Sequence, residues 1–260
     1  MIAGKVLMDR NVPEALRDTP ASGDEDSKVL IERWHGRGRL RYAVTPRFAP
    51  TSSPEQLAAA GKLLDEYPDV YLHTHMSENQ NEIQWVSELF PEAKHYLDVY
   101  DSHGLARRRS VFAHCIHLQQ DEWARLGASG SSIAFCPSSN MFLGSGLFAL
   151  SKAKQSDIPV GLGSDIGAGT GLSCFHTMDA AYKTPQLQQQ SLSPLQNLYL
   201  ATLGGAVALE LDDKIGNFQA GKEADFIVID LAATPSLKRR LARASTIEEQ
   251  IFVLATLADY

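Results

Sequence analysis

Residues whose side chains can take part in chemistry follow four of the apolar runs in this sequence. Arg47 comes after "YAVTP", His75 ends "VYLHTH", His114 lies in "SVFAHC", and Asp165 closes "IPVGLGSD". Imidazole nitrogens and carboxylate oxygens are ligands that Zn²⁺ and Fe²⁺ accept in proteins. A metal with an open coordination position lowers the pKa of water toward neutrality, as hydrolysis requires. The four residues therefore indicate metal-assisted hydrolysis if the fold brings them together.

The two histidines of "YLHTH" have two interpretations. Side chains alternate along a strand, so His73 and His75 lie on one face, which is the geometry of an H-x-H metal clamp. However, His114 follows His75 by 39 residues and Asp165 follows His114 by 51. One strand-helix unit fits the first interval and two fit the second, which matches strands five, six and eight of a barrel. On this interpretation only His75 is a ligand, and His73 is packed or hydrogen-bonded one layer deeper.

Each of these residues, taken alone, has a simpler explanation. A single histidine at a strand end is more often a hydrogen-bonded core residue than a ligand, and charged groups are common where loops begin. Only the joint placement of His75, His114 and Asp165 favours a site. The histidines that lack this placement are expected to be structural: His35, His95, His103, His117 and His176. Cys115 and Cys136 lie inside predicted strands and are expected to be small buried apolar residues.

Six short apolar runs predict strands, and amphipathic segments between them predict helices. The predicted strands are 1–8, 40–46, 70–75, 110–115, 131–137 and 158–165. In "SSPEQLAAAGKLLDEYPD", Ser53 is a helix N-cap and Gln56 its capping-box partner. Continuous apolar strands alternating with helices predict an α/β fold with a parallel sheet.

The position of the polar residues distinguishes two architectures for this sheet. In a (β/α)8 TIM-type barrel the carboxyl ends of all strands meet at one mouth, where residues from several strands converge. A doubly wound dinucleotide-binding sheet has less support, because no G-x-G-x-x-G follows the first strand. We therefore predict a metal-dependent hydrolase barrel over residues 1–212. Residues 213–230 predict a β-hairpin, so 213–260 would begin a small accessory β-sandwich and end in a helix.

Composition excludes several classes of function. The 260 residues carry a net charge of -7 and no long basic run, which argues against a nucleic-acid polymer as partner. Three cysteines without a C-x-x-C spacing give neither a disulfide framework nor a thiolate zinc cluster, and a reducing cytoplasm is the expected location. No apolar run approaches the ~18 residues of a membrane span, so no membrane partner is expected.

Five segments in order resemble the guanine deaminases of the amidohydrolase superfamily, in the branch that also holds chlorohydrolases: "PRFAPTSS", "HTHMSEN", "FAHC", "SSIAFCPSSN" and "GLGSDIGAG". The resemblance implies a zinc enzyme of purine metabolism, with Fe²⁺ as the alternative metal, that converts guanine and water to xanthine and ammonia. The alternatives are a deaminase or chlorohydrolase acting on another amino-substituted N-heterocycle, or a catalytically inactive fragment of such an enzyme.

The resemblance also implies roles in the reaction. His75 and Asp165 would be metal ligands, and Asp165 would also take the proton of the attacking water. His114 would contact the activated water or the reacting centre. Glu78 would move a proton to a ring nitrogen and then to the departing ammonia.

Two further residues would bind the purine. Arg47 would recognise O6, because a permanently charged planar donor distinguishes a carbonyl from the amine of adenine. Phe48 would stack on the base.

The sequence departs from the family pattern at its beginning. Nothing upstream of His73 supplies the first-strand H-x-H, so we expect the chain to lack two metal ligands and the first two barrel strands. Weak zinc binding and no measurable guanine turnover by the 260 residues alone would follow. The uncovered strand edges at 1–8 and 158–165 predict that the chain alone is self-associated, partly disordered near Met1 and Asp165, or poorly soluble. A homo-oligomer is the expected assembly.

Overall fold

The computed structural model describes residues 1–258, whose strands form one sheet in the order β1-β3-β4-β5-β6-β7, with β2 also paired to β3. The pairs from β1 through β5 are parallel, as predicted. The strands are β1 Ile2–Ala3, β2 Val6–Leu7, β3 Arg41–Pro46, β4 Tyr71–Met76, β5 Ser110–His114, β6 Ser132–Phe135 and β7 Val160–Leu162. All six predicted strands are present, but the first is divided into β1 and β2. Gly4 lies at this break, where an added Cβ would approach the Ala43 carbonyl oxygen to 1.8 Å.

Helices connect the strands. They are η1 Glu14–Leu16, α1 Pro20–Trp34, η2 Ala49–Thr51, α2 Pro54–Glu66, α3 Gln80–Leu89, α4 Tyr96–Asp101, α5 Gln120–Ser129, α6 Pro137–Phe142, α7 Leu150–Gln155, α8 Cys174–Leu187, α9 Pro194–Ala201, α10 Leu203–Ala208, α11 Pro235–Leu241 and α12 Ile247–Leu257. No helix in the described part of the chain has both the length and the apolar character needed to cross a membrane.

Helix α2 begins where the sequence predicts, but its cap differs in one detail. Ser53 Oγ accepts a hydrogen bond from the backbone N–H of Gln56. The second bond of a capping box, from the Ser53 N–H to the Gln56 side-chain oxygen, is absent. The Ser53 N–H donates instead to Asp9 Oδ1 at 2.7 Å. A charged carboxylate is a stronger acceptor than a neutral amide. The capping-box prediction was therefore wrong in its partner.

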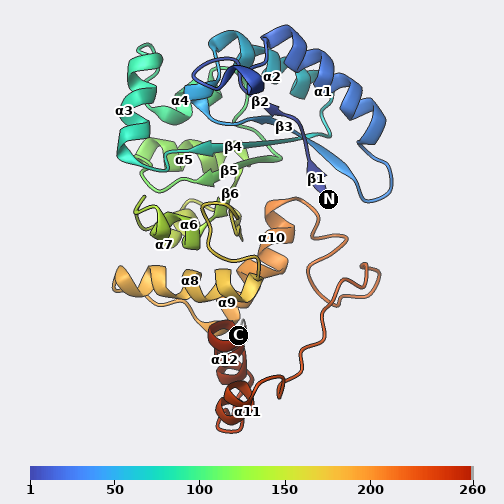
Figure 1. The fold of residues 1–260 in the computed structure, drawn as a ribbon, viewed down its shortest axis with the longest axis vertical. Helices are drawn as coiled ribbons and strands as arrows, with labels where there is room; N and C mark the ends of the chain where they lie inside the picture. The colour runs from blue at the N-terminus through green and yellow to red at the C-terminus, as the bar shows by residue number, and fades with distance from the viewer. Residues whose placement is uncertain (259–260) are drawn as a thin grey trace. The chain divides into compact units, whose positions relative to one another are not determined.

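The chain divides into two compact units, and the first comprises residues 1–133 and 156–158. In this unit α1 and α2 pack against each other and against β3, as the blue end of Figure 1 shows. Its core includes Leu57, Leu63, Leu72 and Phe112, each with no exposed side-chain surface. The amphipathic face predicted for α2 supplies two of these residues, so the hydrophobic pattern fixes how α2 covers the sheet.

The second unit comprises residues 134–155 and those from 159 onward. Phe135 at the end of β6 packs on Phe148, with ring centroids 4.9 Å apart. Helix α12 packs on α8 and α9, where Tyr182 meets Phe252 edge to face at 5.0 Å. Helices α9 and α10 are separated at Thr202.

The β-hairpin predicted over 213–230 is absent from the structure. Residues 213–230 contain turns and extended chain but no strand, and Figure 1 draws them as part of the loop between α10 and α11. Phe226 and Val228, the apolar residues of the expected strand, are 62% and 88% exposed. A strand forms only where a neighbour accepts and donates its backbone hydrogen bonds, and none of the described strands pairs with this segment. The predicted helix toward the C-terminus is present as α11 and α12.

Candidate active site

His75 lies at the end of β4, and its ring is oriented by a backbone carbonyl. Its Nδ1 is 2.7 Å from the carbonyl oxygen of Arg47, and its backbone N–H donates to the same oxygen at 3.1 Å. A carbonyl oxygen only accepts hydrogen bonds, so Nδ1 must carry the proton when the ring is neutral. Nε2 then keeps its lone pair, which is the form in which histidine binds a metal.

The surroundings of His75 keep its ring neutral. Burial of the ring, followed by the nearby His114, lowers the pKa of His75 to about 4. The two rings are stacked, with centroids 5.3 Å apart and planes 24° from parallel. A positive charge on the His75 ring is disfavoured at this distance from His114, so His75 is a neutral donor near pH 7.

The backbone at three strand exits is in the left-handed region. The φ angles of Ser77, His114 and Asp165 are 51°, 72° and 48°, and Cys115 after His114 has φ 50°. Residues with a Cβ rarely adopt this conformation, and such strain concentrates at functional sites. None of the four is glycine or asparagine, so the sequence carried no signal for it.

Asp165 follows β7 in a tight turn. Its carbonyl oxygen accepts hydrogen bonds from the N–H groups of Gly169 at 2.6 Å and Ala168 at 3.2 Å. At Gly169 an added Cβ would lie 1.7 Å from the Ser164 carbonyl oxygen, so only glycine fits there. This turn fixes the backbone from which the Asp165 carboxylate projects.

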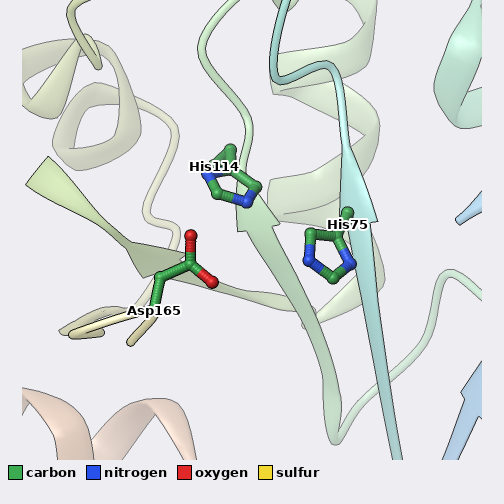
Figure 2. Close-up of side chains that lie close together, drawn as sticks. All are labelled: His75, His114 and Asp165. Carbon is green, nitrogen blue, oxygen red and sulfur yellow. The ribbon is translucent and has the colours of Figure 1, made fainter. Parts of the chain in front are cut away.

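His114, which was predicted to contact the reacting centre, lies close to the two predicted metal ligands, His75 and Asp165. Potential ligand atoms of His75, His114 and Asp165 all lie within 4.8 Å of one another, and Figure 2 shows their side chains. The His114 side chain is only 1% exposed. Two imidazoles and a carboxylate are a donor set that suits Zn²⁺ or Fe²⁺, so the residues fit the metal that the sequence predicts.

Glu78, the predicted proton carrier, lies in the short loop between β4 and α3. Its Oε2 is 3.8 Å from His114 Nε2, which is near but longer than a hydrogen bond. The backbone N–H of Glu78 donates to Glu82 Oε2 at 2.9 Å, and Tyr96 donates its hydroxyl to Glu82 Oε1 at 2.7 Å. Burial raises the pKa of Glu82. Glu82 and Tyr96 were not predicted from the sequence, although Glu82 occupies the capping position three residues after Asn79.

Arg47 and Phe48 lie just beyond β3, beside His75. The guanidinium carbon of Arg47 is 4.6 Å from the centre of the Phe48 ring, a cation–π contact. The Phe48 ring meets His75 and Trp85 edge to face, each with centroids 6.3 Å apart. Trp85 on α3 was also missed, because an aromatic residue within a helical pattern is indistinguishable from a core residue. The structure thus brings Arg47, Phe48 and His75 together.

His73 was predicted to be packed or hydrogen-bonded one layer deeper than His75. Its ring is on the same side as that of His75, with centroids 6.4 Å apart, but its side chain is exposed, so the buried, packed alternative was wrong. Alternation along β4 sets the direction of the side chain, while packing depends on what covers that face, which the pattern cannot give.

The structural interpretation of other histidines agrees with their hydrogen bonds. His35 Nδ1 accepts from the Tyr42 N–H, and His95 Nδ1 accepts from the Asp98 N–H at the start of α4. Cys115 and Cys136 are buried, as expected, and all three cysteines are free thiols.

Comparisons with known proteins identify the family of the chain. The sequence model of the amidohydrolase family matches residues 1–257. The guanine deaminase of Escherichia coli strain K12 is 56% identical over 259 residues, which cover 100% of this chain and 59% of that protein. The E. coli guanine deaminase structure superposes with a TM-score of 0.98, covering 100% of this chain and 61% of the other.

A second solved structure extends the likeness to a more distant relative. The guanine deaminase of C. acetobutylicum with bound guanine in the active site is 30% identical, with a TM-score of 0.89 over 98% of this chain and 61% of that one. The chain spans about three-fifths of the length of the relatives it matches. The predicted fold class, part of a TIM-type hydrolase barrel, is confirmed. The chain belongs to the amidohydrolase family.

Proposed function

We propose that this chain carries part of the active site of a guanine deaminase, which converts guanine and water to xanthine and ammonia. The observation that carries the proposal is the grouping of His75, His114 and Asp165, with Glu78 beside His114. Similarity to guanine deaminases over the whole chain supports guanine as the substrate. The reaction forms a bond from the water oxygen to C2 of the purine and breaks the bond from C2 to the exocyclic nitrogen.

His75 and Asp165 are the proposed metal ligands, and His114 is either a third ligand or the group that contacts the activated water. When bound, a divalent cation supplies the positive charge that makes a water acidic enough to lose a proton near pH 7. Zinc is the proposed metal, with Fe²⁺ as the alternative. The Arg47 carbonyl holds the His75 ring with Nε2 available for that cation.

Protons move through the two carboxylates. Asp165 accepts the proton of the attacking water, and Glu78 donates a proton to the ring nitrogen next to C2. Protonation makes C2 more electrophilic. The Glu78 carboxylate then takes the proton of the new C2 hydroxyl and donates it to the amine, which leaves as ammonia, and the proton held by Asp165 restores the acid form of Glu78. Hydrogen bonds to the backbone around Glu78 keep its carboxylate near His114 during both transfers.

The purine is held by Arg47 and Phe48 in this proposal. The guanidinium donates to O6, and the Phe48 ring supplies a flat apolar surface for the base. Trp85 limits the movement of the Phe48 ring through their edge-to-face contact. We also propose a cytoplasmic location, which three free thiols support, and a homo-oligomer.

The experiment compares two histidine variants in one strand. In a preparation that turns over guanine, the turnover, measured as loss of guanine absorbance and release of ammonia, should be abolished by His75→Ala and largely retained by His73→Ala. Zinc titration of the 260-residue chain provides a second readout that does not require turnover. We expect weak binding of one zinc by the wild type and none by His75→Ala.

Two results would contradict the proposal. Equal zinc binding by wild type and His75→Ala would remove the metal site from β4. Turnover of another amino-substituted or chlorinated N-heterocycle, with none of guanine, would favour the alternative enzyme class. The expectation that the 260 residues alone are inactive is tested in the same assay.

A further inference from the structure

We propose that Tyr100 is a positioning residue. Its hydroxyl forms hydrogen bonds to both the Arg47–Phe48 loop and the end of β4, and it thereby determines which ring nitrogen of His75 carries the proton. Its relevance to catalysis rests on the proposed function, but the position of the proton can be measured without metal or substrate. Tyr100 is not among the proposed ligands or proton carriers, and nothing in the sequence motifs indicates it.

The Tyr100 hydroxyl makes three hydrogen bonds at this point. It donates to the His75 carbonyl oxygen at 2.8 Å and accepts from the Ala49 N–H at 2.9 Å. The Thr74 hydroxyl lies 3.2 Å away and also contacts the hydroxyl as a donor. A tyrosine hydroxyl has one proton and two lone pairs, so this set uses its full capacity.

These bonds join two segments that are distant in sequence. Ala49 follows the loop that carries Arg47 and Phe48, whereas Thr74 and His75 are the last part of β4. The Arg47 carbonyl accepts the N–H of His75 and lies 3.3 Å from the Thr74 hydroxyl, whose one proton is shared between this oxygen and the Tyr100 hydroxyl. Tyr100 therefore sets the separation between the Arg47 carbonyl and the His75 ring.

The distance between the Arg47 carbonyl and the His75 ring determines which ring nitrogen carries the proton. The 2.7 Å contact between the Arg47 oxygen and Nδ1 stabilises the form with the proton on Nδ1. If the loop moves away, the other neutral form, with the proton on Nε2, gains population and has no lone pair there. Partners of this kind, which orient a ligand without touching the metal, commonly change metal affinity by about 10–100-fold.

The surroundings of Tyr100 favour a fixed hydroxyl over an adaptable one. The side chain is fully buried, between Tyr96 at 5.6 Å and Phe112 at 5.6 Å, measured between ring centroids. Burial raises the pKa of Tyr100, so the hydroxyl keeps its proton and remains a donor to His75. No water is needed to complete its hydrogen bonds, and the ring has little space to turn.

The test is Tyr100→Phe in the 260-residue chain, with Tyr42→Phe as the matched control. Tyr42, near the start of β3, is also buried. Its hydroxyl accepts a hydrogen bond from the Lys5 N–H and makes none to His75 in the described structure. Nitrogen NMR of ¹⁵N-histidine-labelled, metal-free protein reports which ring nitrogen carries the proton. The His75 signals are assigned by their loss in His75→Gln.

We expect wild type and Tyr42→Phe to show His75 protonated on Nδ1, and Tyr100→Phe to show a mixture of both forms. Zinc affinity should fall about 10–100-fold in Tyr100→Phe and stay within about twofold in Tyr42→Phe. If Tyr100→Phe does not fold, Thr74→Val removes the neighbouring hydroxyl and should shift the proton in the same direction to a smaller extent.

The outcomes separate this proposal from the proposed function. An unchanged His75 proton position and zinc affinity in Tyr100→Phe, or in Thr74→Val if it replaces that variant, would overturn the positioning role. Absence of zinc binding by the wild type would count against the proposed metal site, while the NMR result would still decide the role of Tyr100.

Discussion

The end of β4 and the segment 213–230 have similar apolar patterns and opposite structures. "VYLHTH" becomes a strand with parallel neighbours on both sides, β3 and β5. "FIVID", near the end of 213–230, has at least as strong a β-propensity but forms no strand, and Val228 is 88% exposed. The difference shows that an apolar pattern indicates which side chains a segment can bury. Whether the segment forms a strand depends on neighbouring strands that pair with it.

The same difference applies to the side chains of the two regions. Around β4, the Arg47 carbonyl, the Tyr100 hydroxyl and the His75 ring are joined by hydrogen bonds between segments far apart in sequence. In 213–230, the hydrogen bonds within the described chain are mainly local, such as that from the Gln219 N–H to Asn217 Oδ1. A site that needs fixed proton positions is therefore found on the first kind of segment.

The largest expected effect is loss of the core under β4. Leu72 has no exposed surface, and Leu72→Ala should lower the free energy of unfolding by about 2–5 kcal/mol, because the cavity adds to the lost apolar transfer. Urea denaturation followed by tryptophan fluorescence measures it, since Trp34, Trp85 and Trp123 all lie in the first unit.

Leu231→Ala is the matched control for Leu72→Ala. Leu231 is 45% exposed at the end of the loop, so its change should be below about 0.5 kcal/mol. Equal losses in the two variants would show that the contrast between the regions does not exist in solution.

Substrate recognition gives the next effect. In a preparation that turns over guanine, Arg47→Ala should lower kcat/KM by about 2–4 kcal/mol of transition-state binding, because O6 loses a charged donor. Arg33→Ala, which removes a cation–π contact with Trp34 on the exposed side of α1, is the control. Unchanged guanine turnover in Arg47→Ala would exclude O6 recognition by this residue.

Strands β3, β4 and β5 and the chemically active residues near them could be predicted from sequence, because each of these residues comes at the end of an apolar run. Strand ends follow from apolar runs, and His75, His114 and Arg47 come at those ends. The role of Tyr100 could not be predicted, since it depends on hydrogen bonds to segments 25–51 residues away. Glu82 has a local capping signal after Asn79, but its bond to Tyr96, 14 residues away, has none. The positive φ at His114 likewise has no sequence signal, and the exposure of His73 depends on what covers its face.

A smaller effect concerns pH and the start of β3. His35 Nδ1 accepts the Tyr42 N–H at 3.0 Å, which requires a neutral ring, and partial burial lowers the pKa of His35 from 6.5. As pH falls below 6.5, the unfolded chain takes up a proton that the folded chain resists, so folding stability decreases. His35→Gln keeps an acceptor but does not titrate.

The loss of stability between pH 7 and pH 5.5 should therefore be smaller in His35→Gln by a few tenths of a kcal/mol, because the exposed part of the ring is screened by solvent. Thermal unfolding at the two pH values measures this. A larger loss in the variant than in the wild type would reverse the sign and contradict the hydrogen bond to Tyr42.

The smallest expected effect is that of Val228→Pro, and the same substitution in a paired strand, Val44→Pro, serves as its disruptive control. Proline removes a backbone donor and fixes φ, which a paired strand does not tolerate and a solvated extended segment does. Val44→Pro, in the middle of β3 between paired neighbours, should prevent stable folding, whereas Val228→Pro should change the free energy of unfolding by less than about 0.5 kcal/mol. Far-ultraviolet circular dichroism during denaturation measures both, and hydrogen exchange should show unprotected amides at Phe226 and Val228 in the wild type.

Protected amides at Phe226 and Val228, together with a concentration-dependent loss of stability in Val228→Pro, would mean that the segment pairs with a second copy of the chain. The exposed segment would then be the contact of the proposed homo-oligomer, and the contrast with β4 would hold only for the isolated chain.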